Sequence, residues 1–180
     1  MVLQLKYGHV LTILICTYLP PLTGAKSFGA LEQMQNFVDV LKQIYVDFPQ
    51  SKFVIVGDFN IPGIDWCNTD FGVLHNNKST FRIVNGVAEL LQYIVNSLAL
   101  RSNINICNSF DNYLDLNFSD IDGLEVHDCM DPLFDVKRSH VSLEITFVIP
   151  QLNTLTATQT LLNFYQADYI KINRDIKEND

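Results

Sequence analysis

The chain has 180 residues, a length that fits one domain of ordinary size with a sizeable buried core. Apolar residues make up 48% of it and charged residues 18%, which excludes a disordered tail and indicates a folded globular domain. The net charge is −8, and residues 111–135 include acidic side chains but no Lys or Arg. This charge argues against tight, general nucleic-acid binding by the chain alone. It leaves room for a nuclease whose carboxylates hold a divalent cation, because the ion supplies the positive charge.

The cysteine spacing and the apolar N-terminal run point to an intracellular protein. No C-x-x-C pair occurs, so the sequence indicates reduced thiols rather than a zinc ribbon or redox motif, at Cys16, Cys67, Cys107 and Cys129. The apolar run 10–16 lacks the cleavage pattern of a secretory signal and is too short to cross a membrane. We therefore expect an intracellular location, no secretion and no membrane partner.

The first half of the chain alternates between strand and helix patterns. Residues 11–18 are apolar and β-branched and are followed by Pro20-Pro21, which predicts a strand that runs into a loop. Residues 29–48 carry apolar side chains at three- and four-residue spacing, which predicts an amphipathic helix over one face of a sheet. The continuous apolar run 53–57 predicts a strand that is buried on both faces.

The second half predicts one more long helix and then short strands. The helix is expected over residues 79–98, and the strands over residues 104–107, 113–118, 124–129 and 141–148. Residues 149–180 read as a linker and a weak helix, so we divide the chain into a domain over residues 1–148 and this tail. The fold class that follows is α+β, a mixed α/β layered fold.

Four short motifs stand in an informative order. They are Y-x-P-P at residues 18–21, G-D-F-N at 57–60, I-D-W at 64–66 and L-D-L at 114–116. Together they resemble the endonuclease/exonuclease/phosphatase superfamily in the form found in insect-type (jockey-like) non-LTR retrotransposons of the LINE class. Residues 163–173 are similar to the connector that leads such polyproteins toward their reverse transcriptase. The resemblance spans nearly the whole chain but only the C-terminal part of the family's domain.

The resemblance implies Mg²⁺-dependent hydrolysis of a phosphodiester in DNA. This chemistry needs an oriented water, a base and positive charge on the phosphoryl oxygens. By resemblance, Asp58 orients or activates the water, Asn60 holds a phosphate oxygen and Tyr18 adds a phenolic donor there. Asp115 is the metal-linked or supporting carboxylate, and His140 is the family's terminal, phosphate-contacting histidine. Since Asp58 and Asn60 are two residues apart in a predicted strand, we expect both side chains on one face.

Each of these residues also has an ordinary structural interpretation. Gly-Asp after a strand is often only a turn in which Asp58 caps its own backbone. Tyr18 is then a strand-end residue with an exposed hydroxyl, and His140 a surface residue at the start of an edge strand. Asp115 is harder to explain in this way, because Asp is depleted from strands and costly to bury unpaired. The resemblance, and not residue type alone, assigns these positions to a site.

Other residues invite a functional interpretation with less support. Asp65 and Trp66 are either recognition residues or, as we expect for the indole, packed against the loop. His127 is either a metal ligand or an ordinary strand side chain, as the alternation there indicates. The acidic residues 111–135 lack the spacing of a calcium loop, which predicts a solvated acidic face.

Two departures from the family predict weak activity or none. Many members have an acid directly before the terminal histidine, whereas this chain has Ser139, and Asp135 is the nearest acidic residue. The family's metal-binding Glu and an early Asn lie on strands upstream of the Y-x-P-P motif, near which this chain begins. We therefore expect a partial four-layer α/β sandwich of the family's type, with N-terminal strands missing and an exposed apolar sheet edge.

Two interpretations of function follow. In the first, the chain is a remnant or fragment of a retrotransposon endonuclease, whose full-length ancestor bound DNA and Mg²⁺ while this acidic fragment binds them weakly or not at all. In the second, it is a non-catalytic interaction or structural module from the same domain, which self-associates through its exposed sheet edge.

Overall fold

The structure is a computed structural model that describes residues 1–7, 9–22, 29–78, 82–132 and 142–148. The chain divides into two compact units, Met1–Pro150 and Gln151–Asp180. The second unit lies outside the described residues, and so do the predicted linker and weak helix. In the part described, the fold is α+β, and no helix there has both the length and the apolar character needed to cross a membrane.

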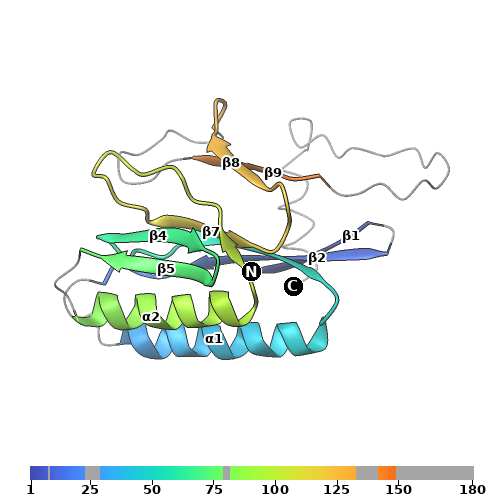
Figure 1. The fold of residues 1–180 in the computed structure, drawn as a ribbon, viewed down its shortest axis with the longest axis horizontal. Coiled ribbons are helices and arrows are strands. Elements are labelled where there is room, and N and C mark those ends of the chain that lie inside the picture. The colour runs from blue at the N-terminus through green and yellow to red at the C-terminus, as the bar shows by residue number, and fades with distance from the viewer. Residues whose placement is uncertain (8, 23–28, 79–81, 133–141, 149–180) are drawn as a thin grey trace, which may run out of the picture. The chain divides into compact units, whose positions relative to one another are not determined.

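A five-stranded mixed sheet forms the centre of the first unit (Figure 1). Its strands, in spatial order, are β1 (Val2–Tyr7), β2 (Val10–Tyr18), β3 (Lys52–Asp58), β7 (Asp115–Ser119) and β6 (Arg101–Ser102). β2 and β3 are parallel, and the other neighbouring pairs are antiparallel. The parallel pair needs a crossover, which the first helix provides.

Two helices lie side by side on one face of this sheet (Figure 1). They are α1 (Ala30–Asp47) and α2 (Arg82–Ser97), and both confirm the helices predicted from periodicity. Their buried stripes pack against the sheet in a core that includes Met34, Leu41, Leu91, Ile13 and Phe53. Burial of such side chains contributes roughly 1.5–3 kcal/mol each, so this face is the main source of stability.

The opposite face of the sheet carries a small hairpin of β8 (Glu125–Asp128) and β9 (Leu143–Thr146). Val54 of β3 is buried there with Leu124 and Val126. Phe53 and Ile55 instead belong to the core on the helix side. β3 is therefore buried on both faces, as its continuous apolar run predicted.

The structure differs from the sequence expectations at three places. Residues 104–107 form no strand, and the ladder with β7 is made instead by β6, two residues long. The hairpin of β4 (Ile64–Thr69) and β5 (Gly72–Asn77) was not predicted. β1 was not predicted either. It pairs with β2 and is the outermost strand on that side of the sheet in the part of the chain described.

Candidate functional site

Three of the predicted site residues lie in one row across the sheet. Tyr18 of β2 is the register partner of Asp58 on β3, and Asp58 is in turn the partner of Asp115 on β7. Side chains alternate along a strand, so Asp58 shares a face with Val54 and points to the hairpin side of the sheet. Motifs that are far apart in the sequence therefore meet at one end of three adjacent strands.

The two carboxylates of the row, Asp58 and Asp115, occupy a close pair of the antiparallel ladder. The backbone N–H of Phe59 donates to the carbonyl oxygen of Leu114 at 2.8 Å. Phe59 and Leu114, the pair that follows along the ladder, are therefore a hydrogen-bonded pair. Hydrogen-bonded and non-hydrogen-bonded pairs alternate, so Asp58 and Asp115 form a non-hydrogen-bonded pair, in which Cβ atoms lie about 4.5–5.5 Å apart. Two carboxylates are thus direct neighbours on one face of the ladder.

Asn60 lies beyond the strand, which corrects the expectation that it continues β3. β3 ends at Asp58, and Asn60 adopts a left-handed backbone conformation with φ of 47°. Its backbone N–H donates to Oδ1 of Asp58 at 3.1 Å, and its Nδ2 donates to the carbonyl oxygen of Leu19 at 2.8 Å. Asn60 is buried, so its amide links the ends of β2 and β3 and leaves one N–H for another acceptor. Asp58 thus has both a capping role and a place in the row.

Gly57 of the G-D-F-N motif allows β3 to approach β2 at the row. A Cβ atom built on Gly57 would lie 2.1 Å from the carbonyl oxygen of Thr17, which is backbone and cannot move away cheaply. The backbone of Gly57, with φ of 159°, is nearly extended, so the close contact and not a turn requires glycine here. This glycine therefore fixes the spacing between Tyr18 and Asp58.

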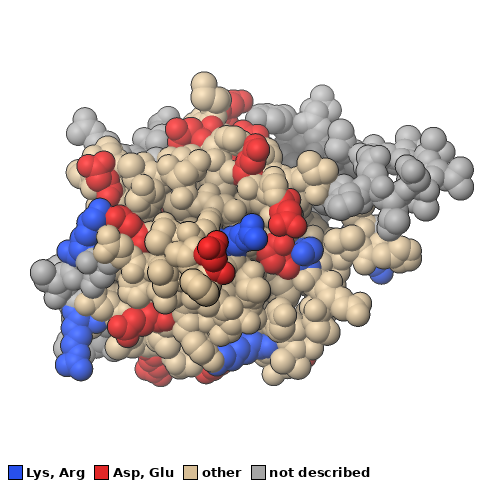
Figure 2. All heavy atoms as spheres, in the orientation of Figure 1, with Lys and Arg blue, Asp and Glu red and all other residues tan. Residues whose placement is uncertain are grey.

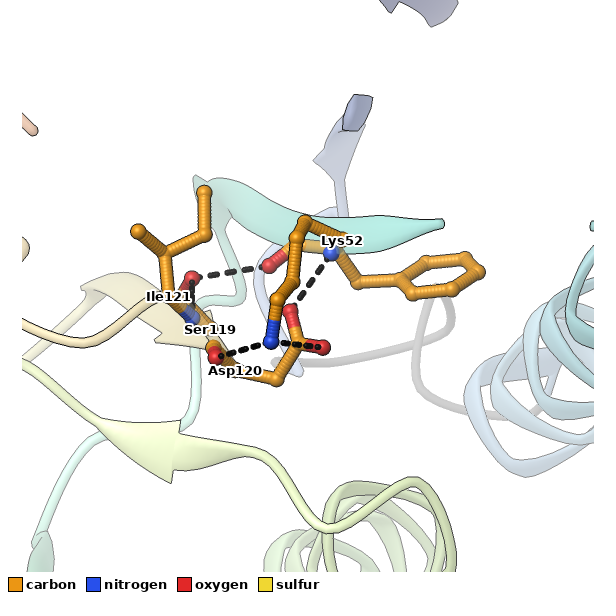
Figure 3. A network of polar contacts seen from close by, with 5 residues as sticks. Lys52, Ser119, Asp120 and Ile121 are labelled. Carbon is orange, nitrogen blue, oxygen red and sulfur yellow. Dashed lines mark hydrogen bonds and ion pairs between the residues drawn. The ribbon is translucent and has the colours of Figure 1, made fainter. Parts of the chain in front are cut away.

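A polar network at the far end of β3 fixes the register of the row (Figure 3). The backbone N–H of Phe53 donates to Oδ1 of Asp120 at 2.7 Å, and Oγ of Ser119 donates to the carbonyl oxygen of Phe53 at 2.8 Å. Lys52 forms an ion pair with Oδ2 of Asp120 at 3.4 Å. Since a one-residue slip turns every side chain to the other face, this network helps to keep Asp58 opposite Asp115.

Asp65 and Trp66 of β4 border a small pocket of about 300 Å³, whose lining also includes Lys78 and Tyr113. The indole of Trp66 packs on Phe118 with ring centroids 5.5 Å apart, so it is packed as expected, but against β7 and not against the loop. Asp65 and Lys78 form an ion pair at 2.5 Å, and this hydrogen-bonded partner raises the pKa of Lys78 above 10.5. Asp65 is therefore used in a local ion pair.

The remaining predicted positions fall outside the row or outside the described residues. His140 lies outside the described residues, as do Ser139 and Asp135. His127 is an exposed strand residue of β8, 3.1 Å from Glu125, as alternation predicted. Among the residues that the structure describes, no group of three or more His, Cys, Asp or Glu side chains is arranged to hold a metal ion, and the four cysteines are free.

Asn117 is a polar residue near the row that sequence reasoning missed. It lies two residues beyond Asp115 on β7, so both side chains share a face. Asn117 is only 1% exposed; its Oδ1 accepts from Nδ2 of Asn103 at 3.0 Å, but its own Nδ2 is buried without a partner in the part of the chain described. The signal available was the alternation in β7 of the polar residues Asp115, Asn117 and Ser119 with the apolar residues Leu116 and Phe118.

Charged side chains of both signs are spread over the face shown in Figure 2. On the face shown in Figure 2, the described Lys and Arg side chains lie singly among acidic ones and are not gathered into one patch. With a net charge of −8, a nucleic-acid backbone meets little general attraction here.

Comparisons of the chain with protein-family models, with curated proteins and with solved structures gave no match. The functional assignment therefore depends on the motifs and on the geometry of the row.

Proposed function

We propose that the described unit derives from a Mg²⁺-dependent phosphodiesterase of the endonuclease/exonuclease/phosphatase type that cut DNA in a non-LTR retrotransposon. In this proposal the fold is part of the family's four-layer sandwich, and the chain retains one side of the site with weak activity or none. The observation that carries the proposal is the row of Tyr18, Asp58 and Asp115. Three motifs named from the sequence thus supply side chains at one end of three adjacent strands.

The donor set of the row suits Mg²⁺. This ion keeps several waters and is commonly bound by one or two carboxylates together with substrate phosphate, which matches the opposed Asp58 and Asp115. A bound Mg²⁺ supplies the positive charge that the phosphoryl oxygens of the substrate meet. Beside the ion, Asp58 would orient the attacking water, and the exposed hydroxyl of Tyr18 would donate to a phosphate oxygen.

Low activity follows from the sequence around the terminal histidine. Ser139 cannot act as the acid that orients His140, and in a serine-protease triad the loss of that acid costs about 10⁴ in turnover. The acidic surface adds a kinetic penalty, because it lowers the local concentration of an anionic substrate. Turnover and the encounter with an anionic substrate are thus both reduced without any loss of the fold.

Nicking of supercoiled plasmid with Mg²⁺ tests the proposal directly. The wild-type chain is compared with Asp58→Asn, which removes the charge but retains an oxygen that can accept from Asn60. Asp39→Asn on the exposed surface of α1 is the control for the same change in net charge. Slow nicking that disappears only in Asp58→Asn supports the site. Nicking that persists in Asp58→Asn contradicts it.

A second function is favoured by the exposed apolar residues of β1, which suit an interaction module better than an enzyme. If the chain is only such a module, all three proteins fail to nick DNA. Mg²⁺ then leaves their thermal unfolding unchanged, and Asp58→Asn alters nothing except local stability.

A further inference from the structure

Two sheet edges in the described unit are closed by side-chain amides. Asn68 of β4 accepts from the backbone N–H of Ser102 on β6 and donates to the carbonyl oxygen of the same residue. Asn96 of α2 makes the same pair of bonds to Val73 of β5. Each amide bonds the backbone N–H and C=O groups that a further strand would use. The edges of β6 and β5 therefore offer few unpaired backbone groups to another chain.

The outer edge of β1 has no such protection. The N-terminal amine of Met1 donates to the carbonyl oxygen of Cys16, and the backbone N–H of Cys16 donates to that of Met1. Odd-numbered residues of β1 therefore pair with β2, and the backbone groups of Val2, Gln4 and Lys6 point away from the sheet. No described residue pairs with those outward groups.

The side chains of β1 suit an additional strand. Val2, Leu3 and Leu5 are 46%, 42% and 42% exposed, and Leu3 and Leu5 share the hairpin-side face of the sheet. The strand contains no Pro and no acidic residue, and the first acidic residue in the chain is Glu32. The protein has a net charge of −8, so a strand without acidic residues repels a second copy less than the acidic segments of the chain do.

We propose that two copies of the chain associate by antiparallel pairing of their β1 strands about Gln4. This register places Gln4 opposite Gln4 of the second copy. The outward backbone N–H and C=O groups of the two strands then bond to each other in hydrogen-bonded pairs. Leu3 then lies opposite Leu5 of the second copy, and Val2 opposite its Lys6. No like charges face each other, and the two sheets become one continuous sheet.

The backbone requirement is tested by sedimentation equilibrium on a matched pair of variants. Gln4→Pro removes one outward N–H without removing a bond between β1 and β2, whereas Gln4→Thr retains the N–H and the strand propensity. The wild-type chain and Gln4→Thr are expected to dimerise, and Gln4→Pro to sediment as a monomer. A monomeric wild-type chain, or a dimer that survives Gln4→Pro, overturns the proposal.

A second pair of variants tests the register even where Gln4→Pro perturbs the fold. Val2→Glu places an acid opposite Lys6 of the second copy, and Val2→Lys places a like charge there. Two symmetric pairs are affected, so the dimer dissociation constant is expected to be about tenfold higher for Val2→Lys than for Val2→Glu. Net charge alone predicts the opposite order, since Val2→Lys reduces the overall negative charge. Equal constants or the opposite order contradict this register.

Discussion

Asp58 and Asp115 face each other across the antiparallel ladder between β3 and β7, where they form a non-hydrogen-bonded pair. Such a position brings side chains closer than any other in an antiparallel ladder. A hydrophobic or oppositely charged pair stabilises a sheet there, and two carboxylates do not. In the proposed function, a Mg²⁺ ion held at the row would offset this repulsion.

Removal of either charge should reduce the effect of Mg²⁺ on stability. At a tenfold excess over its Kd, an ion that binds only the native state raises the free energy of unfolding by about 1.4 kcal/mol. We expect this gain for the wild-type chain and little of it for Asp58→Asn or Asp115→Asn, measured by urea unfolding with Mg²⁺ and with EDTA. Equal gains in all three proteins would place the ion elsewhere.

Gly57→Ala should destabilise the protein by roughly 3 kcal/mol, because the new methyl group collides with the carbonyl oxygen of Thr17. Gly29→Ala is a suitable control. Its added Cβ meets only the end of the Gln33 side chain, at an ordinary 3.8 Å, and we expect a change of about 0.5 kcal/mol or less. Thermal unfolding followed by circular dichroism measures both. A mild effect of Gly57→Ala would mean that β2 and β3 separate easily.

Asp120 should matter as a hydrogen-bond acceptor more than as a charge. Asp120→Ala leaves the backbone N–H of buried Phe53 without its acceptor, which costs about 1–3 kcal/mol. Asp120→Asn retains an acceptor oxygen and loses only the half-exposed ion pair with Lys52, worth about 1 kcal/mol or less. Urea denaturation of the two variants separates these contributions, and equal losses would argue against the acceptor role.

Asn96 should contribute through both of its bonds to Val73. Asn96→Ala orphans one donor and one acceptor at the edge of β5, and we expect a loss of about 2 kcal/mol. Asn96→Asp retains the acceptor for the N–H of Val73 but loses the donor, so its loss should be smaller. Hydrogen exchange of the Val73 amide provides the local readout, and unchanged protection in Asn96→Ala would contradict the role.

The ion pair between Lys78 and Asp65 should be visible in a titration. The hydrogen bond and charge of Asp65 raise the pKa of Lys78 above 10.5, so Asp65→Asn should return it toward that value. A raised pKa means that the stabilisation is fully present below pH 10.5 and is lost as the pH rises through the folded-state pKa. NMR titration of the lysine side chain measures the shift, and Asp111→Asn should change it less than Asp65→Asn does.

The elements that the sequence predicted well are those with local patterns. α1 and α2 follow from apolar periodicity. β2 follows from an apolar run that stops before Pro20, and β3 from one that stops at Asp58. The hairpin of β4 and β5 has no clear alternation and no Asn-Gly turn. It depends on side chains of α2, such as Asn96, that become neighbours only in the folded chain.

The apolar alternation of residues 104–107 predicted a strand that has no partner in the described ladders. Strand formation depends on a neighbour, and β7 pairs instead with residues 101 and 102. Register is equally non-local. Motifs nominated Tyr18, Asp58 and Asp115, but only strand pairing could show that they form a row, and only backbone geometry could show that Asn60 turns away from β3.

The contacts among Lys52, Phe53, Ser119 and Asp120 lie at the opposite end of β3 from the row. In the proposed function, the contacts that hold the strand register and the side chains that would carry out the chemistry are thus separated along one strand. A lineage released from selection for cleavage can change the row one residue at a time and still inherit a folded protein. Under the proposed function, the folded unit would stay available for another use after cleavage is lost.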